Sequence, residues 1–216
     1  MTVNTEELLQ RYTAGERNFA GINLSYTNLI GVDLSEADLS RCFLKGAKLH
    51  GANLTGAILK EARLDDAILR HTVLDEADLS HSNLDGSNFE SASLKRANLA
   101  NCRMTEGILD KANLEGANLQ SALIVDSGLE KTNFTNANLK DAQIMETSID
   151  LSEIDLAGAN LSGSSLISIN LTNANLSNTN LSYANLEGAV IEGTNFDGAI
   201  FCKTIMPDGN VQNDGC

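Results

Sequence analysis

Residues 37–66 read ADLSR-CFLKG-AKLHG-ANLTG-AILKE-ARLDD, and this stretch decides the fold. A large apolar residue stands third in every block of five, beginning with Leu39. A small residue stands two positions earlier, beginning with Ala37, and the residue between them is often Asn or Asp elsewhere in the chain, as in ANLEG and ANLSN. A repeat of this kind has to be read before any local signal, because it sets the architecture of the whole chain.

The same period extends over most of the chain. Stepping by five from Phe19 to Ile149 meets Leu, Ile, Phe or Met at all 27 positions. The register then shifts by two residues, which we assign to Ser152 and Glu153, and ten more large residues follow from Leu156 onward. Because 42% of the residues are hydrophobic, such a run would arise by chance with a probability of about 10⁻¹⁴.

A period of five fits neither an α-helix nor a flat strand, whose side chains repeat every 3.6 and every two residues. Here one large and one small residue in every five point inward. A chain that turns once per block and buries each pair can coil into a solenoid, with neighbouring coils paired through their backbones at about 4.8 Å. Small inward residues let the walls approach closely, which explains the absence of Trp.

The pattern A-(D/N)-L-x-x resembles that of the pentapeptide-repeat family, and the resemblance covers residues 17–203. It implies an all-β solenoid, a right-handed quadrilateral β-helix with four pentapeptides per coil. About nine coils would make a rod on the order of 45 Å long. We expect a capping helix within residues 1–16, the β-helix at 17–203 with a register break near 150–155, and a tail at 204–216.

The two ends depart from the repeat. Residues 4–15 predict a short helix with Asn4 as N-cap, Glu7 three residues later and Gly15 as C-cap. Its apolar face would cover the open end of the first coil or bind a partner, and consists of Leu8, Leu9 and Tyr12. At the other end, Cys202 and Cys216 are either two free thiols in a reducing cytosol or a disulfide that pins the tail.

Composition excludes several classes of function. The net charge of −14 argues against nucleic acid and anionic membranes as direct ligands. No apolar run reaches transmembrane length and the start lacks a signal-peptide core, so we expect a cytoplasmic protein. A filled solenoid offers no concave site, so we expect no enzyme, no catalytic residues, no cofactor and no metal. His50 and His71 are interpreted as solvated surface.

Residues twenty apart should stack on the outer walls. One predicted acidic column consists of Glu90, Asp110, Glu130 and Asp150. It is either a solvated wall that keeps the rod soluble or an imitation of the DNA backbone, as in the family's gyrase-protecting branch. The inward positions argue against the second interpretation, because that branch is richer in Phe and Cys whereas this chain is Leu-centred.

One predicted outward patch is apolar and consists of Leu123, Val125 and Met145. It either packs beneath a displaced loop at the register break or forms a docking surface for a protein. The stretches LLQRYTAGERNFAGINL and IMPDG are similar to cyanobacterial members of the family, one of which regulates heterocyst differentiation by contacting other proteins. We expect a scaffold or protein-interaction rod, monomeric or weakly dimeric, whose protein partner is unknown. The alternative is a DNA-mimicking modulator of a topoisomerase.

Overall fold

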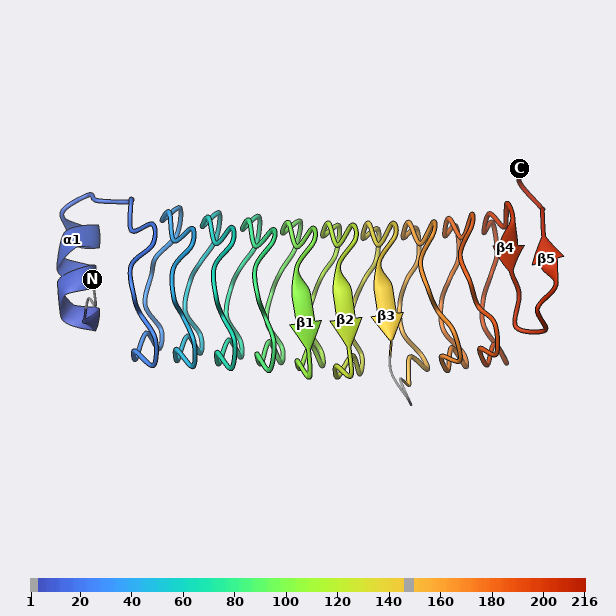
Figure 1. Ribbon diagram of the computed structural model, residues 1–216, viewed down its shortest axis with the longest axis horizontal. Helices are drawn as coiled ribbons and strands as arrows, with labels where there is room; N and C mark the ends of the chain where they lie inside the picture. The colour runs from blue at the N-terminus through green and yellow to red at the C-terminus, as the bar shows by residue number, and fades with distance from the viewer. Residues whose placement is uncertain (1–3, 146–149) are drawn as a thin grey trace.

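The computed structural model describes residues 4–145 and 150–216, which form one elongated stack of coils (Figure 1). Each coil pairs with the next through parallel backbone bridges between residues twenty apart, for example Asp38 with Ile58 and Asn98 with Asn118. The chain therefore completes one turn every twenty residues, which is four pentapeptides. Each pentapeptide contributes one side of a four-sided coil.

Every pentapeptide consists of an extended step and a tight turn. In the block that begins at Ala37, Ala37 and Leu39 are buried, and the N–H of Cys42 donates to the Leu39 carbonyl at 3.1 Å to close the turn. Arg41, at the corner, has a φ of 58°. This geometry matches a type II turn, which requires a positive φ at its third residue. A non-glycine residue is held there because the backbone on both sides is bonded to neighbouring coils.

Backbone N–H and carbonyl groups form hydrogen bonds between neighbouring coils. The N–H of Leu39 donates to the Ile58 carbonyl at 2.8 Å, and the N–H of Asp38 donates to the Arg17 carbonyl of the preceding coil at 2.7 Å. Regular strands are short because each wall is only one step long. One wall carries three parallel strands, β1 (Arg103–Thr105), β2 (Leu123–Val125) and β3 (Gln143–Met145). We call it the β1–β3 wall.

Leucine and alanine fill the interior, as the repeat predicts. The third-position side chains of the middle coils are buried, and Leu114 and Ala117 are both fully inaccessible. Polar residues at the small inward position turn their hydroxyls to the backbone: Thr72 Oγ1 donates to the Leu49 carbonyl at 2.8 Å. The interior is therefore a continuous apolar column.

Helix α1 (Thr5–Thr13) lies across the N-terminal end of the stack (Figure 1). Asn4 is its N-cap, and its side chain accepts a hydrogen bond from the Glu7 N–H at 2.8 Å, as predicted. Leu8 is fully buried, and the Tyr12 hydroxyl donates to the Ser35 carbonyl at 2.9 Å. These contacts attach the helix to the first coils.

The register break lies earlier than the sequence interpretation placed it. Ser152 and Glu153 are not extra residues, since they form an ordinary corner: the φ of Glu153 is 59° and its N–H donates to the Thr172 carbonyl at 2.9 Å. Leu151 is only 2% exposed and stands at a central inward position. Ile149, which the sequence interpretation made central, lies outside the described residues.

The two additional residues therefore fall in the interval between Ile144 and Leu151, which is seven residues instead of five. The coil that contains them has 22 residues, because Asn133 pairs with Asp155 and Gln143 with Ser165. The coils on both sides of the break remain stacked in one column.

At the C-terminal end, β4 (Thr204–Ile205) and β5 (Val211–Gln212) pair as an antiparallel hairpin. The stack continues slightly past the predicted boundary at residue 203, since the Ile205 N–H donates to the Ala184 carbonyl. The tail then folds back, and a disulfide joins Cys202 to Cys216 with their Cα atoms 4.6 Å apart. Of the two alternatives that the sequence left open, the structure has the disulfide.

Candidate interaction surfaces

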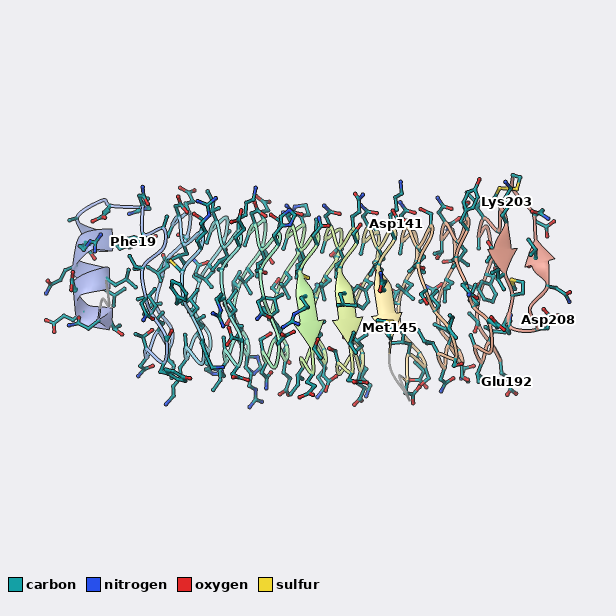
Figure 2. The ribbon with its side chains drawn as sticks, viewed as in Figure 1. Phe19, Asp141, Met145, Glu192, Lys203 and Asp208 are labelled. Carbon is teal, nitrogen blue, oxygen red and sulfur yellow. A yellow bond between two sulfur atoms is a disulfide. The ribbon has the colours of Figure 1, made fainter. Side chains whose placement is uncertain are left out.

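The apolar side chains predicted on one wall come together on the β1–β3 wall. Leu123 and Val125 lie in β2, and Val125 pairs in register with Met145, which ends β3 (Figure 2). Leu123 and Val125 are half-buried, whereas the Met145 side chain is 42% exposed. Leu123, Val125 and Met145 thus form one contiguous, outward-facing apolar surface.

A fourth member of this surface was missed in the sequence. Gln143 pairs with Ser165, so Ile167 occupies in the next coil the position that follows Met145 along the same column. Ile167 is 46% exposed. A fixed step of twenty from Met145 leads to Ser165, and only a step of 22 across the break finds Ile167. We call Leu123, Val125, Met145 and Ile167 together the apolar patch.

Polar residues bound the apolar patch along the wall. In the preceding coil, Arg103 and Thr105 stand opposite Leu123 and Val125, and Arg103 forms an ion pair with Asp85. The position that follows Ile167 in the next coil is Glu187. The patch is therefore an apolar area with a charged rim, which is the usual anatomy of a surface that contacts another protein.

Glu90, Asp110 and Glu130 follow one another at intervals of one coil on a neighbouring wall. Opposite charges accompany two of them: Arg70 lies 3.0 Å from Glu90, and Lys131 lies 3.2 Å from Glu130. The Asp110 carboxylate accepts a hydrogen bond from the Glu130 N–H at 2.9 Å. These pairs reduce the negative charge of the column.

The prediction that Asp150 belongs to this column is wrong. Asp150 directly precedes the central residue Leu151 and pairs with Asn170, whereas Glu130 directly follows its central residue. The physical reason is the position of the two additional residues, which lie before Asp150 and not after it. Its carboxylate accepts hydrogen bonds from Ser152 and from Asn170 Nδ2, and these bonds lower the pKa of Asp150.

A ladder of amide side chains, which begins at the carboxylate of Asp78, runs along another wall. Each Nδ2 donates to the Oδ1 of the residue one coil earlier, at 2.9, 3.0, 2.9 and 3.2 Å, along the series Asp78, Asn98, Asn118, Asn138 and Asn160. Each Oδ1 also accepts the N–H two residues later in the chain, as from Gln120 to Asn118. The repeated Asn therefore fixes both the turn and the stacking of coils.

Two of the histidines contact each other, and the two cysteines outside the disulfide are buried. His50 and His71 meet edge to face with ring centroids 5.4 Å apart. No group of three or more metal-ligating side chains occurs within residues 4–145 and 150–216. Cys42 and Cys102 are buried in the interior, and burial raises the pKa of their thiols to about 11 and about 12. Within the same residues, no helix is long and apolar enough to cross a membrane.

The family model for pentapeptide repeats matches this chain in eight copies, over residues 18–56, 47–86, 57–96, 72–110, 112–149, 147–179 and 169–206. The chain therefore belongs to the pentapeptide-repeat family, and its four-sided stack is that family's right-handed quadrilateral β-helix.

Among solved structures, the chain is similar to HetL, a pentapeptide repeat protein involved in heterocyst differentiation regulation from the cyanobacterium Nostoc sp. strain PCC 7120. The two share 31% identity over 97% of this chain and 100% of HetL, with a TM-score of 0.63. A second Nostoc pentapeptide repeat protein is 33% identical over 58% of this chain and 82% of its own, with a TM-score of 0.28. QnrB1, a plasmid-mediated fluoroquinolone resistance protein, is 16% identical over 85% of this chain and 90% of its own, with a TM-score of 0.41. No curated protein matches the sequence significantly.

Proposed function

We propose that this protein is a non-enzymatic interaction rod and that its apolar patch binds another protein. The rod has about nine coils and is closed at its N-terminal end by α1. The observation that carries the proposal is the contiguity of Leu123, Val125, Met145 and Ile167 over three successive coils. Single exposed apolar residues need no explanation, but neighbouring ones on a flat wall are typical of docking surfaces.

The partner that fits this surface is a protein with an apolar contact area of its own. The fold gives the patch a flat and rigid base, because β2 pairs in parallel with β1 on one side and with β3 on the other. Binding would therefore require little ordering of this chain, which favours affinity. The similarity to HetL, which is involved in heterocyst differentiation regulation, extends over nearly the whole chain and supports a regulatory role.

A second candidate function, modulation of a topoisomerase by imitation of DNA, is motivated by the net charge of −14. The walls support it less well, because Arg70 and Lys131 pair with members of the acidic column and Lys45 lies 2.9 Å from Asp65. It predicts binding to DNA gyrase that weakens steeply as salt rises from about 0.05 to 0.5 M, whereas binding through the apolar patch would change little.

The test is affinity capture from the native cell lysate with the wild-type chain and with Met145→Glu and Ile167→Glu. Both residues are exposed, so neither substitution disturbs the interior. Ile58→Glu is the matched control, since Ile58 is 42% exposed on a different wall. We expect the patch variants to lose a protein that the control retains. Recovery of the same proteins by all three variants would contradict the proposal.

A further inference from the structure

The C-terminal end of the stack has an open backbone edge. In the interior, the central residue and the corner residue of each pentapeptide donate their N–H groups to the next coil, as Leu171 does to Val190 and Asn173 to Glu192. In the last coil, the equivalent N–H groups donate to no backbone acceptor in the part of the chain that the structure describes. Four of them belong to two adjacent walls and are those of Ile191, Gly193, Phe196 and Gly198, and a fifth is that of Lys203 at a separate corner.

On the other two walls, carbonyl groups of the tail accept hydrogen bonds from N–H groups of the last coil. The Gly188 N–H donates to the Pro207 carbonyl at 3.0 Å, and the Phe201 N–H donates to the Asp214 carbonyl at 2.8 Å. The tail backbone thus acts as one more rung of the ladder. Figure 1 shows β5 beyond the last coil, where the chain ends. On the remaining two walls, the equivalent N–H groups have no such backbone acceptor in the described part of the chain.

Partly buried apolar side chains lie next to the open backbone edge. Leu171 and Leu176 are fully buried one coil earlier, whereas the equivalent Ile191 and Phe196 are only partly buried. A shallow hollow separates Ile191 from the tail residue Val211, which is 57% exposed. An extended segment laid along the edge would therefore form backbone hydrogen bonds and also cover apolar side chains.

The rim of this end is acidic. Residues 184–216 contain five acidic side chains and one basic side chain, Lys203. Glu192 and Asp197 directly follow Ile191 and Phe196, and Glu192 and Asp208 lie at the C-terminal end in Figure 2. A second copy of the same end would bring a second acidic rim against the first. Like charges in close contact disfavour that arrangement.

We propose that the edge formed by Ile191, Gly193, Phe196 and Gly198 binds a positively charged peptide segment of a partner protein, which is extended along each of the two walls and turns at the corner between them. The carbonyl groups of the segment accept hydrogen bonds from the four N–H groups. Its apolar side chains contact Ile191 and Phe196, and its Lys or Arg side chains lie near Glu192 and Asp197. This surface is separate from the apolar patch, which lies on a side wall.

The experiment uses a fluorescein-labelled peptide of nine residues in which Lys and Val alternate, and the 216-residue protein with its disulfide intact. We expect saturable binding by fluorescence anisotropy, and no binding of the same peptide with Glu in place of Lys. Glu192→Gln combined with Asp197→Asn should weaken binding about three- to tenfold. Glu115→Gln, at an exposed side-wall position in the middle of the rod, is the control and should leave binding unchanged.

Amide hydrogen exchange measured by NMR locates the peptide. Without peptide, the N–H groups of Ile191 and Phe196 should exchange much faster than those of Leu171 and Leu176, which are bonded to the next coil. Saturation with the basic peptide should slow exchange at the two former amides. Binding of the peptide without this slowing would overturn the proposal. Concentration-dependent protection of these amides without peptide, together with a dimer in sedimentation, would overturn it in favour of a second copy.

Discussion

The amide ladder makes the sharpest prediction for stability, through the substitution Asn118→Ala. The Asn118 side chain takes part in three hydrogen bonds. Its Nδ2 donates to Asn98 at 3.0 Å, and its Oδ1 accepts from Asn138 Nδ2 at 2.9 Å and from the Gln120 N–H at 3.2 Å. Alanine removes all three, and the partners then have to bond to water. Because the site is half-buried, water recovers part of the loss.

Asn88 is the matched control for the ladder. It has the same place in its pentapeptide, is half-buried, and accepts a hydrogen bond from the Glu90 N–H at 2.9 Å. Its neighbours in the adjacent coils are Ile68 and Ile108, which cannot continue the ladder. Asn88→Ala therefore removes only the hydrogen bond of the turn, so the difference between the two variants isolates the two amide–amide bonds.

At about 0.5–1 kcal/mol for each partly exposed hydrogen bond, Asn118→Ala should lower the free energy of unfolding by about 1–2 kcal/mol more than Asn88→Ala. Urea unfolding followed by circular dichroism measures both values, provided that the slopes of the two transitions agree. If the two variants differ by less than about 0.5 kcal/mol, the ladder does not stabilise the stack and the reasoning fails.

Four further predictions follow from the interior and the tail. Leu114→Ala should lower the free energy of unfolding by about 2–5 kcal/mol in the same urea assay, because it leaves a cavity in a fully packed column. Reduction of the bond between Cys202 and Cys216, which are 14 residues apart, should destabilise the C-terminal end by up to about 3 kcal/mol; calorimetry with and without dithiothreitol measures this, and an unchanged melting curve would contradict it. Cys42 and Cys102 should resist iodoacetamide at pH 8 until the chain unfolds, because burial raises the pKa of both thiols to about 11 and about 12. Their contribution to stability should be complete below the ordinary thiol pKa of 9.0 and should be lost as the pH rises toward 11 for Cys42 and toward 12 for Cys102, as urea unfolding at increasing pH would show.

Periodicity predicts the interior of this protein well, because every coil repeats the same burial problem. Leu39 and Ala37 are inside for the same reason as their equivalents in each pentapeptide, so a sequence pattern is enough to find them. The same pattern could not place the register break. Ile149 and Leu151 are both apolar and suit the central position equally in the sequence, and the structure decides between them through the burial of Leu151 and the pairing of Asp150 with Asn170.

The error in register carried over to the candidate sites. Asp150 was counted in the acidic column because a step of twenty from Glu130 reaches it. The two additional residues before it place it instead directly before the central residue Leu151, where its backbone pairs with Asn170. Ile167 was missed because its neighbour Met145 lies 22 residues away. The disulfide could not be predicted either, because the tail that carries Cys216 has no repeat to fix its path.

The most direct test of the account is a through-hydrogen-bond NMR coupling experiment, which connects each amide nitrogen to the carbon of the carbonyl group that accepts its hydrogen bond. The structure predicts couplings to the residue 19 positions later in regular coils, as from Leu39 to Ile58. Across the break it predicts a separation of 21, from Phe134 to Asp155 and from Leu139 to Asn160. Couplings to residues four positions earlier, as in a helix, or a mirrored antiparallel pattern would contradict the stacked solenoid.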